Sequence, residues 1–110
     1  MPGARAAFLI GTVNLEVSAV SEAAERLFGD ERTILGSSIL DVLTSPFGHD
    51  KLARTVRGAA LRAAEPEIMP VLGTTEDARG AGTLAARIST CGPPRAALVT
   101  LEPSGFGVRG

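Results

Sequence analysis

The stretch VSAVSEAAERLFGDERTILGSSILDVL, residues 17–43, contains the signals that decide the fold. Its first part, residues 17–20, is short, apolar and rich in valine, which predicts a strand. Ser21 precedes a helical segment, residues 22–28, and its hydroxyl can accept a hydrogen bond from an early helical N–H. Gly29 ends this helix, because glycine adopts a left-handed backbone at little steric cost.

Two single helical turns follow within the same stretch. The first covers residues 31–35 and is ended by Gly36. Ser38 is followed three residues later by Asp41, which resembles a capping box and predicts the second turn, residues 39–43. Turns this short leave space between themselves and whatever sheet they cover.

Working outward, the apolar run at residues 8–12 predicts a buried strand that precedes the stretch. After it, Asp50 is expected to cap a longer helix, residues 51–64, whose apolar residues recur at helical spacing on one stripe. Pro66 is expected to end this helix, because the residue before a proline is pushed out of the helical conformation.

The last third of the chain changes from helical to strand periodicity. Segments 67–72, 83–89 and 96–102 read as strands, with Pro70 indicating an edge position or a bulge. A polar, glycine-containing loop, residues 74–82, joins the first two of these strands. Three consecutive strands with short connections predict an antiparallel meander.

The order of elements therefore predicts an α+β domain. The two N-terminal strands complete a five-stranded antiparallel sheet, with the short helices and the one longer helix on one face. We expect this domain to cover residues 8–103. Residues 1–7 and 104–110 are expected to be flexible ends.

At this point the sequence resembles the PAS family of sensor domains. In that family a strand runs into an N-x-A-A-x-x-x-F-G helix, an E-L-I-G turn and a short helix. The corresponding residues here are Ser21, Ala23, Ala24, Leu27, Phe28, Gly29, Ile34, Leu35 and Gly36. Serine replaces the usual asparagine, and both are good helix caps. The segment SPFGHDKL, residues 45–52, stands where the family often has H-P-D-D, and GPPRAALVTLEPS, residues 92–104, resembles its closing hairpin.

The resemblance implies a chamber between the helices and the sheet. We expect it to be lined by five apolar residues, Phe28, Ile39, Leu43, Leu52 and Val56. In the family such a chamber holds a cofactor, a metabolite or only side chains. No cofactor is predicted here, and a filled core and a pocket for an unknown small ligand both remain open.

The resemblance also implies a regulatory function and not an enzymatic one. We expect a sensory module of a cytoplasmic bacterial transcription regulator, histidine kinase or other output protein. It would form a homodimer through PAS–PAS contacts and bias the output domain by a population shift. Leu61 falls on the side of the long helix opposite Leu52, so it is an interface candidate.

Two alternatives involve chemistry. A haem-binding sensor would need His49, the single histidine, to point inward. Flavin-binding members of the family carry a cysteine in the short helix after the second glycine, and this segment, residues 37–43, has none. A small enzyme would use His49 and Asp50, but no acid–base pair or triad has the required spacing. Cys91 lies in a predicted turn. Because it is the single cysteine, neither a disulfide within the chain nor a cysteine-rich metal site can form. No metal site is predicted.

The composition of the chain excludes several other classes of function. The chain has 110 residues, enough for one domain, and its 45% hydrophobic and 21% charged residues are typical of a folded protein. A net charge of -1 without a basic stripe argues against direct nucleic-acid binding. No apolar run reaches the roughly 18–20 residues that cross a bilayer, so no membrane contact is expected.

Overall fold

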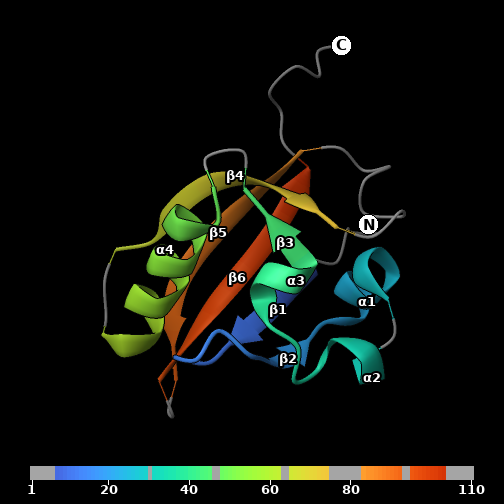
Figure 1. Ribbon diagram of the computed structural model, residues 1–110, viewed down its shortest axis with the longest axis horizontal. Coiled ribbons are helices and arrows are strands. Elements are labelled where there is room, and N and C mark those ends of the chain that lie inside the picture. Colours follow the sequence, from blue (N-terminus) through green and yellow to red (C-terminus); the bar gives the residue numbers. More distant parts are fainter. Residues whose placement is uncertain are drawn as a thin grey trace, which may run out of the picture.

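A computed structural model describes residues 7–29, 31–45, 48–62, 65–74, 83–92 and 95–103 (Figure 1). Within these residues, six strands form one antiparallel sheet: β1 (Ala7–Gly11), β2 (Val17–Val20), β3 (Leu43–Thr44), β4 (Glu67–Gly73), β5 (Leu84–Cys91) and β6 (Ala96–Pro103). The same ranges contain four helices: α1 (Glu22–Phe28), α2 (Glu31–Ile34), α3 (Ile39–Val42) and α4 (His49–Leu61). The strands are arranged β2-β1-β6-β5-β4-β3 across the sheet.

The last three strands form the antiparallel meander that the sequence predicts. β4 pairs with β5, and β5 pairs with β6 over its full length, with Ile88 opposite Val99. β1 occupies the other side of β6, where Leu9 lies opposite Val99. The first and last strands of the domain therefore lie side by side in the middle of the sheet.

The sheet has six strands where the sequence predicts five. The additional strand, β3, is only two residues long and pairs with the end of β4, with Leu43 opposite Gly73 and Thr44 opposite Leu72. The sequence placed Leu43 in the preceding helical turn, but its backbone is extended, with φ -124° and ψ 146°. Pro70 precedes the part of β4 that β3 covers, which agrees with the predicted edge position.

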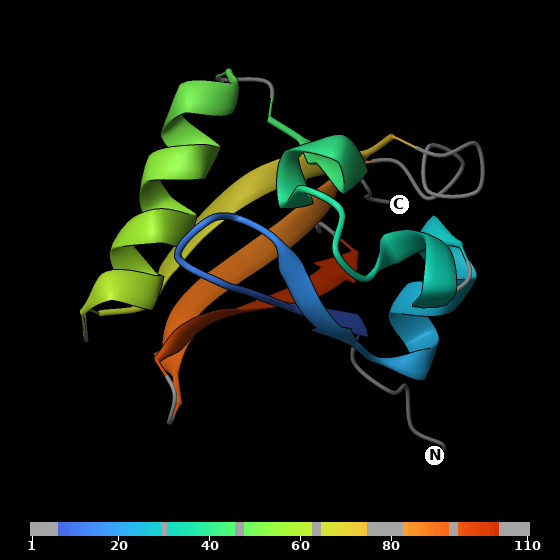
Figure 2. The ribbon, with the colours of Figure 1, turned by 60° about the horizontal axis from the view of Figure 1, so that its bottom comes forward.

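All four helices lie on one side of the curved sheet (Figure 2). Side chains alternate along each strand, so the residues facing the helices are buried while their neighbours are partly or fully exposed. In β6, Ala97, Val99 and Leu101 are buried, as the alternation predicts, and Ala96 at the start of the strand is buried as well. The hydrophobic core therefore lies between this inner face of the sheet and the helices.

Ser21 caps α1 as predicted, and it also joins the helix to the sheet. Its Oγ accepts hydrogen bonds from the N–H of Ala24 at 3.2 Å and from the N–H of Phe8 in β1 at 2.9 Å. Gly29 follows the helix with φ +115°, a conformation that favours glycine. Ser38 caps α3 as predicted, with its Oγ accepting from the N–H of Leu40 at 3.2 Å.

The boundaries of α4 differ from the prediction at both ends. The helix begins at His49, with Gly48 as its N-cap at φ +100°, so Asp50 lies in the first turn and is not the cap. It ends at Leu61, because Arg62 already has an extended backbone. The predicted continuation to residues 63–64 lies outside the described residues.

Three smaller expectations concern loops and ends. Ala7 belongs to β1, although the sequence placed it in the N-terminal tail; the rest of both predicted tails lies outside the described residues. The loop predicted at residues 74–82 is described only at Thr74. In the described part of the chain, no helix has the length and apolar character needed to cross a membrane.

Candidate functional site

The five residues predicted to line a chamber belong to one buried cluster. Phe28 comes from α1, Ile39 from α3, Leu43 from β3, and Leu52 and Val56 from α4. Four of them are 0% exposed and Phe28 is 4% exposed. The fold thus brings residues from four elements together on the inner face of the sheet. Their role as a ligand pocket stays a prediction.

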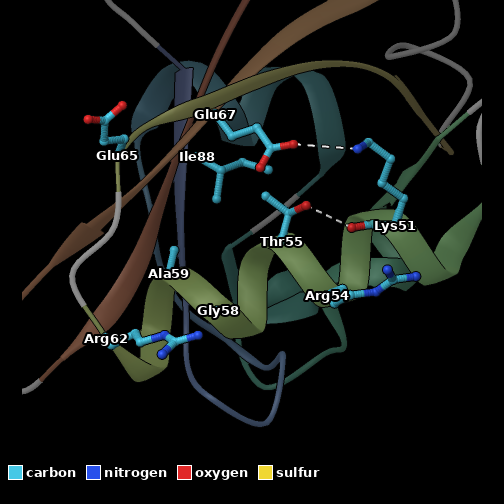
Figure 3. Close-up of a pocket in the computed structure, with 9 residues that line it drawn as sticks. All are labelled: Lys51, Arg54, Thr55, Gly58, Ala59, Arg62, Glu65, Glu67 and Ile88. Atoms are coloured by element: carbon cyan, nitrogen blue, oxygen red, sulfur yellow. Dashed lines mark hydrogen bonds and ion pairs between the residues drawn. The ribbon is translucent and has the colours of Figure 1, made fainter.

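A groove with polar rims lies elsewhere, between α4 and the start of β4 (Figure 3). Its volume is about 360 Å³. It is lined by Lys51, Arg54, Thr55, Gly58, Ala59, Arg62, Glu65, Glu67 and Ile88. Only Ala59 and Ile88 also belong to the buried cluster, so the groove is separate from the predicted chamber.

The groove exists because small residues of α4 face it. Gly58 has no side chain, and a Cβ built there would meet no atom within 4 Å. Ala59, the next residue, carries a single methyl group. The helix packs mainly against β5 and β6, so the space beside β4 is not filled.

One end of the groove is closed by an ion pair between its two walls. The Nζ of Lys51 in α4 lies 3.5 Å from Oε2 of Glu67 in β4 (Figure 3). Both side chains are 49% exposed, so the pair contributes only about 0–1 kcal/mol to stability. Its importance is therefore geometric, because it spans the groove from the helix to the strand.

The remaining charged side chains of the groove form no ion pair with any residue that the structure describes. Among the described residues, neither Arg54 nor Arg62 forms an ion pair, and Glu65 forms none either. All three are exposed. Two guanidinium groups on the helix wall are thus available to a bound molecule.

The structure places the other candidate residues at the surface. His49 is exposed, and its Nε2 lies 3.3 Å from Oγ1 of Thr44, so its side chain does not face the buried cluster. Leu61 is 55% exposed, as its position opposite the buried Leu52 predicts; its role in an interface stays a prediction. Cys91 is a free thiol at the end of β5. Over the described ranges, no three His, Cys, Asp or Glu residues gather into a metal site.

The outer face of the sheet is a second candidate surface. It carries the side chains that alternate with the inward-facing ones, and its apolar members include Phe8, Ile10, Ile68, Pro70, Leu72, Ala85 and Leu98. Ile68 is the most exposed of these at 64%. Within the described residues, no helix covers this face (Figure 2).

The groove was missed in the sequence, although a signal for it is present. Lys51, Arg54, Gly58 and Arg62 follow one another at intervals of three or four residues, which places them on one stripe of a helix. The signal is Gly58, a residue without a side chain, which lies between Arg54 and Arg62 on the same side of the helix.

No model of a protein family and no curated protein matches the sequence. In three dimensions, the chain is similar to the crystal structure of the PAS domain of an HTR-like protein from Haloarcula marismortui. The TM-score is 0.66, the sequence identity is 15%, and the match covers 93% of this chain and 89% of that one. The similarity therefore extends over the sheet and the helices together. It confirms the fold expected from the sequence: the chain has the fold of a PAS domain.

Proposed function

We propose that the chain is a sensory and regulatory module that acts through protein–protein contact and catalyses no reaction itself. The fold it shares with a PAS domain supports a sensory role. Its expected setting is a cytoplasmic regulator, such as a histidine kinase or a transcription regulator, with an output domain that responds to the state of this module.

One observation carries the interaction part of the proposal: the outer face of the sheet is largely apolar, and none of the helices in the described part of the chain lies over it. Leu98 and Ile10 lie opposite each other at its centre, on β6 and β1. Both are partly exposed, and side chains directly opposite each other on paired strands lie close enough to form one apolar surface. Burial of such apolar surface against a partner is favourable, because it removes the surface from water.

We propose a second copy of the chain as that partner. An interface between identical copies must be self-complementary, since each contact occurs twice around the twofold axis. Among the described residues, the outer face carries one exposed cation, Arg87, and one exposed anion, Glu102, beside the apolar residues. Each can therefore meet its opposite on the other copy, which favours a homodimer over a partner of uniform charge.

The regulatory mechanism follows from the position of this face. A signal that changes how α4 and the short helices pack on the inner face would alter the strands beneath them. The same strands form the outer face, so the signal would shift the population of dimer arrangements. The output domain would respond to that shift.

The experiment compares two glutamate substitutions by sedimentation equilibrium. Leu98→Glu places a charge in the apolar face and should turn the dimer into a monomer while circular dichroism stays unchanged. Leu61→Glu places the same charge on the exposed side of α4 and should leave the dimer intact. A dimer that resists Leu98→Glu and is lost with Leu61→Glu would move the interface to the helix. A wild-type monomer at all concentrations would refute dimerisation.

A further inference from the structure

We propose that the groove between α4 and β4 binds a small organic monocarboxylate with a short aliphatic part. The site differs from the apolar chamber expected under the helices. The inference deepens the proposed sensory function and rests on it for its biological meaning. Binding itself can be measured whether or not the chain dimerises.

The size of the groove fits a small molecule. Its volume of about 360 Å³ lies in the range of about 300–1,000 Å³ that is common for ligand pockets. Ala59 and Ile88 supply an apolar floor, and the missing side chain of Gly58 leaves room above it. A short aliphatic chain can therefore lie on the floor without displacing protein atoms.

The charges of the groove favour a carboxylate. Arg54 and Arg62 line the helix side, and in the described part of the chain neither has a carboxylate partner. A guanidinium group presents parallel N–H donors that match the two oxygens of a carboxylate. The most direct way to satisfy these donors is an anion lying along α4.

The same charges limit the ligand to a single negative charge. The lining contains three cations and two anions, an excess of one positive charge. Lys51 is already paired with Glu67, so it offers little to a ligand. A second negative charge on the ligand would exceed this excess, and the two glutamates of the lining, Glu65 and Glu67, would repel it. The groove should therefore prefer monocarboxylates to dicarboxylates and to phosphate.

The first experiment is a titration of the uniformly ¹⁵N-labelled protein, followed by amide chemical shifts at constant ionic strength. Butyrate is the probe, and butylammonium, butanol and succinate are matched controls. Butyrate should give saturable shifts at residues 54–62 and 65–67. Butylammonium and butanol should give none there, and succinate should bind more weakly. Absent shifts with butyrate, or equal shifts with butylammonium, would overturn the proposal.

Variants then test which residues hold the anion. Arg62→Gln and Arg54→Gln should each weaken butyrate binding about tenfold, because a hydrogen bond to a charged group is lost. Arg57→Gln is the matched control, since it removes the same charge from an exposed position of α4 that does not line the groove. An equal loss with Arg57→Gln would show a general charge effect and would reject the site.

Gly58→Leu gives an independent steric test. Leucine suits a helix, and its side chain would extend into the groove, so butyrate binding should be abolished while the fold is kept. Unchanged binding in a folded Gly58→Leu protein would place the ligand elsewhere and contradict the proposal. If Gly58→Leu does not fold, the arginine variants decide alone. Sedimentation equilibrium on the same samples separates the two proposals. A protein that is monomeric and binds butyrate would refute only the dimer. A protein that is dimeric and does not bind butyrate would refute only this site.

Discussion

The hydroxyl of Thr90 donates a hydrogen bond to the carbonyl oxygen of Ala59 at 2.7 Å, which ties β5 to the last turn of α4. The carbonyl of Arg62 lies 3.1 Å from the same hydroxyl, and Nη1 of Arg95 donates to the carbonyl of Leu61 at 2.9 Å. The last carbonyls of a helix have no partner within the helix and carry partial negative charge. Side chains of β5 and of the turn before β6 therefore cap α4, and they fix the end of the groove that contains Ala59 and Arg62.

Thr90→Val tests this contact between the helix and the sheet. Valine keeps the shape and the strand propensity of threonine but cannot donate, so the partly buried carbonyl of Ala59 loses its partner. We expect a loss of about 1 kcal/mol in the free energy of unfolding. Urea denaturation measures the loss, and Thr83→Val, at an exposed position outside any strand, is the control. Equal values for the two variants would show that the hydroxyl contributes nothing.

Ser21→Ala removes two hydrogen bonds from one oxygen. The N–H of Ala24 loses its helix cap, and the N–H of Phe8 loses its acceptor. The expected loss is about 1–2 kcal/mol in the free energy of unfolding, measured by thermal or urea denaturation. Ser21→Asn keeps a capping group and should lose less. If asparagine is as damaging as alanine, the contact with Phe8 and not the cap dominates.

Gly58→Ala should stabilise the protein. The added methyl group meets no atom within 4 Å, and alanine is favoured over glycine within a helix by about 0.5–1 kcal/mol. Gly36→Ala is the opposing control, because Gly36 has φ +86° and alanine is strained there. Both variants are compared by the midpoint of thermal unfolding. A destabilised Gly58→Ala protein would mean that the groove is narrower than described.

Leu52→Ala and Leu61→Ala compare the two sides of α4. Leu52 is 0% exposed, so its truncation should cost about 2–5 kcal/mol in the free energy of unfolding. Leu61 is 55% exposed, and its truncation should change stability by no more than about 0.5 kcal/mol. Urea denaturation provides both values. A cost below about 1 kcal/mol for Leu52→Ala would indicate loose packing around it and would favour the ligand-pocket interpretation of the buried cluster.

The local rules of the sequence predicted most elements of this fold. Ser21 and Ser38 cap the helices as expected, because capping depends on a side chain and an N–H only two or three residues away. The alternation of Ala97, Val99 and Leu101 with their neighbours predicted which face of β6 is buried. These features could be predicted since each is decided within a few residues of chain.

Three features were decided by contacts between distant segments. β3 forms because Leu43 pairs with Gly73, which is 30 positions away in the sequence. A strand of two residues is too short to show the alternation that would predict it. The end of α4 at Leu61 depends on Thr90 and Arg95, which approach only after the sheet has formed. The groove needs β4 to lie beside the stripe that contains Gly58.

The sequence by itself determined the order of the elements other than β3, the caps of α1 and α3, and the side of the longer elements that faces the core. Only the tertiary structure decided where space remains between them. The physical reason is that capping hydrogen bonds and hydrophobic periodicity involve residues close together in the sequence, whereas the size of a groove depends on the distance between two packed elements.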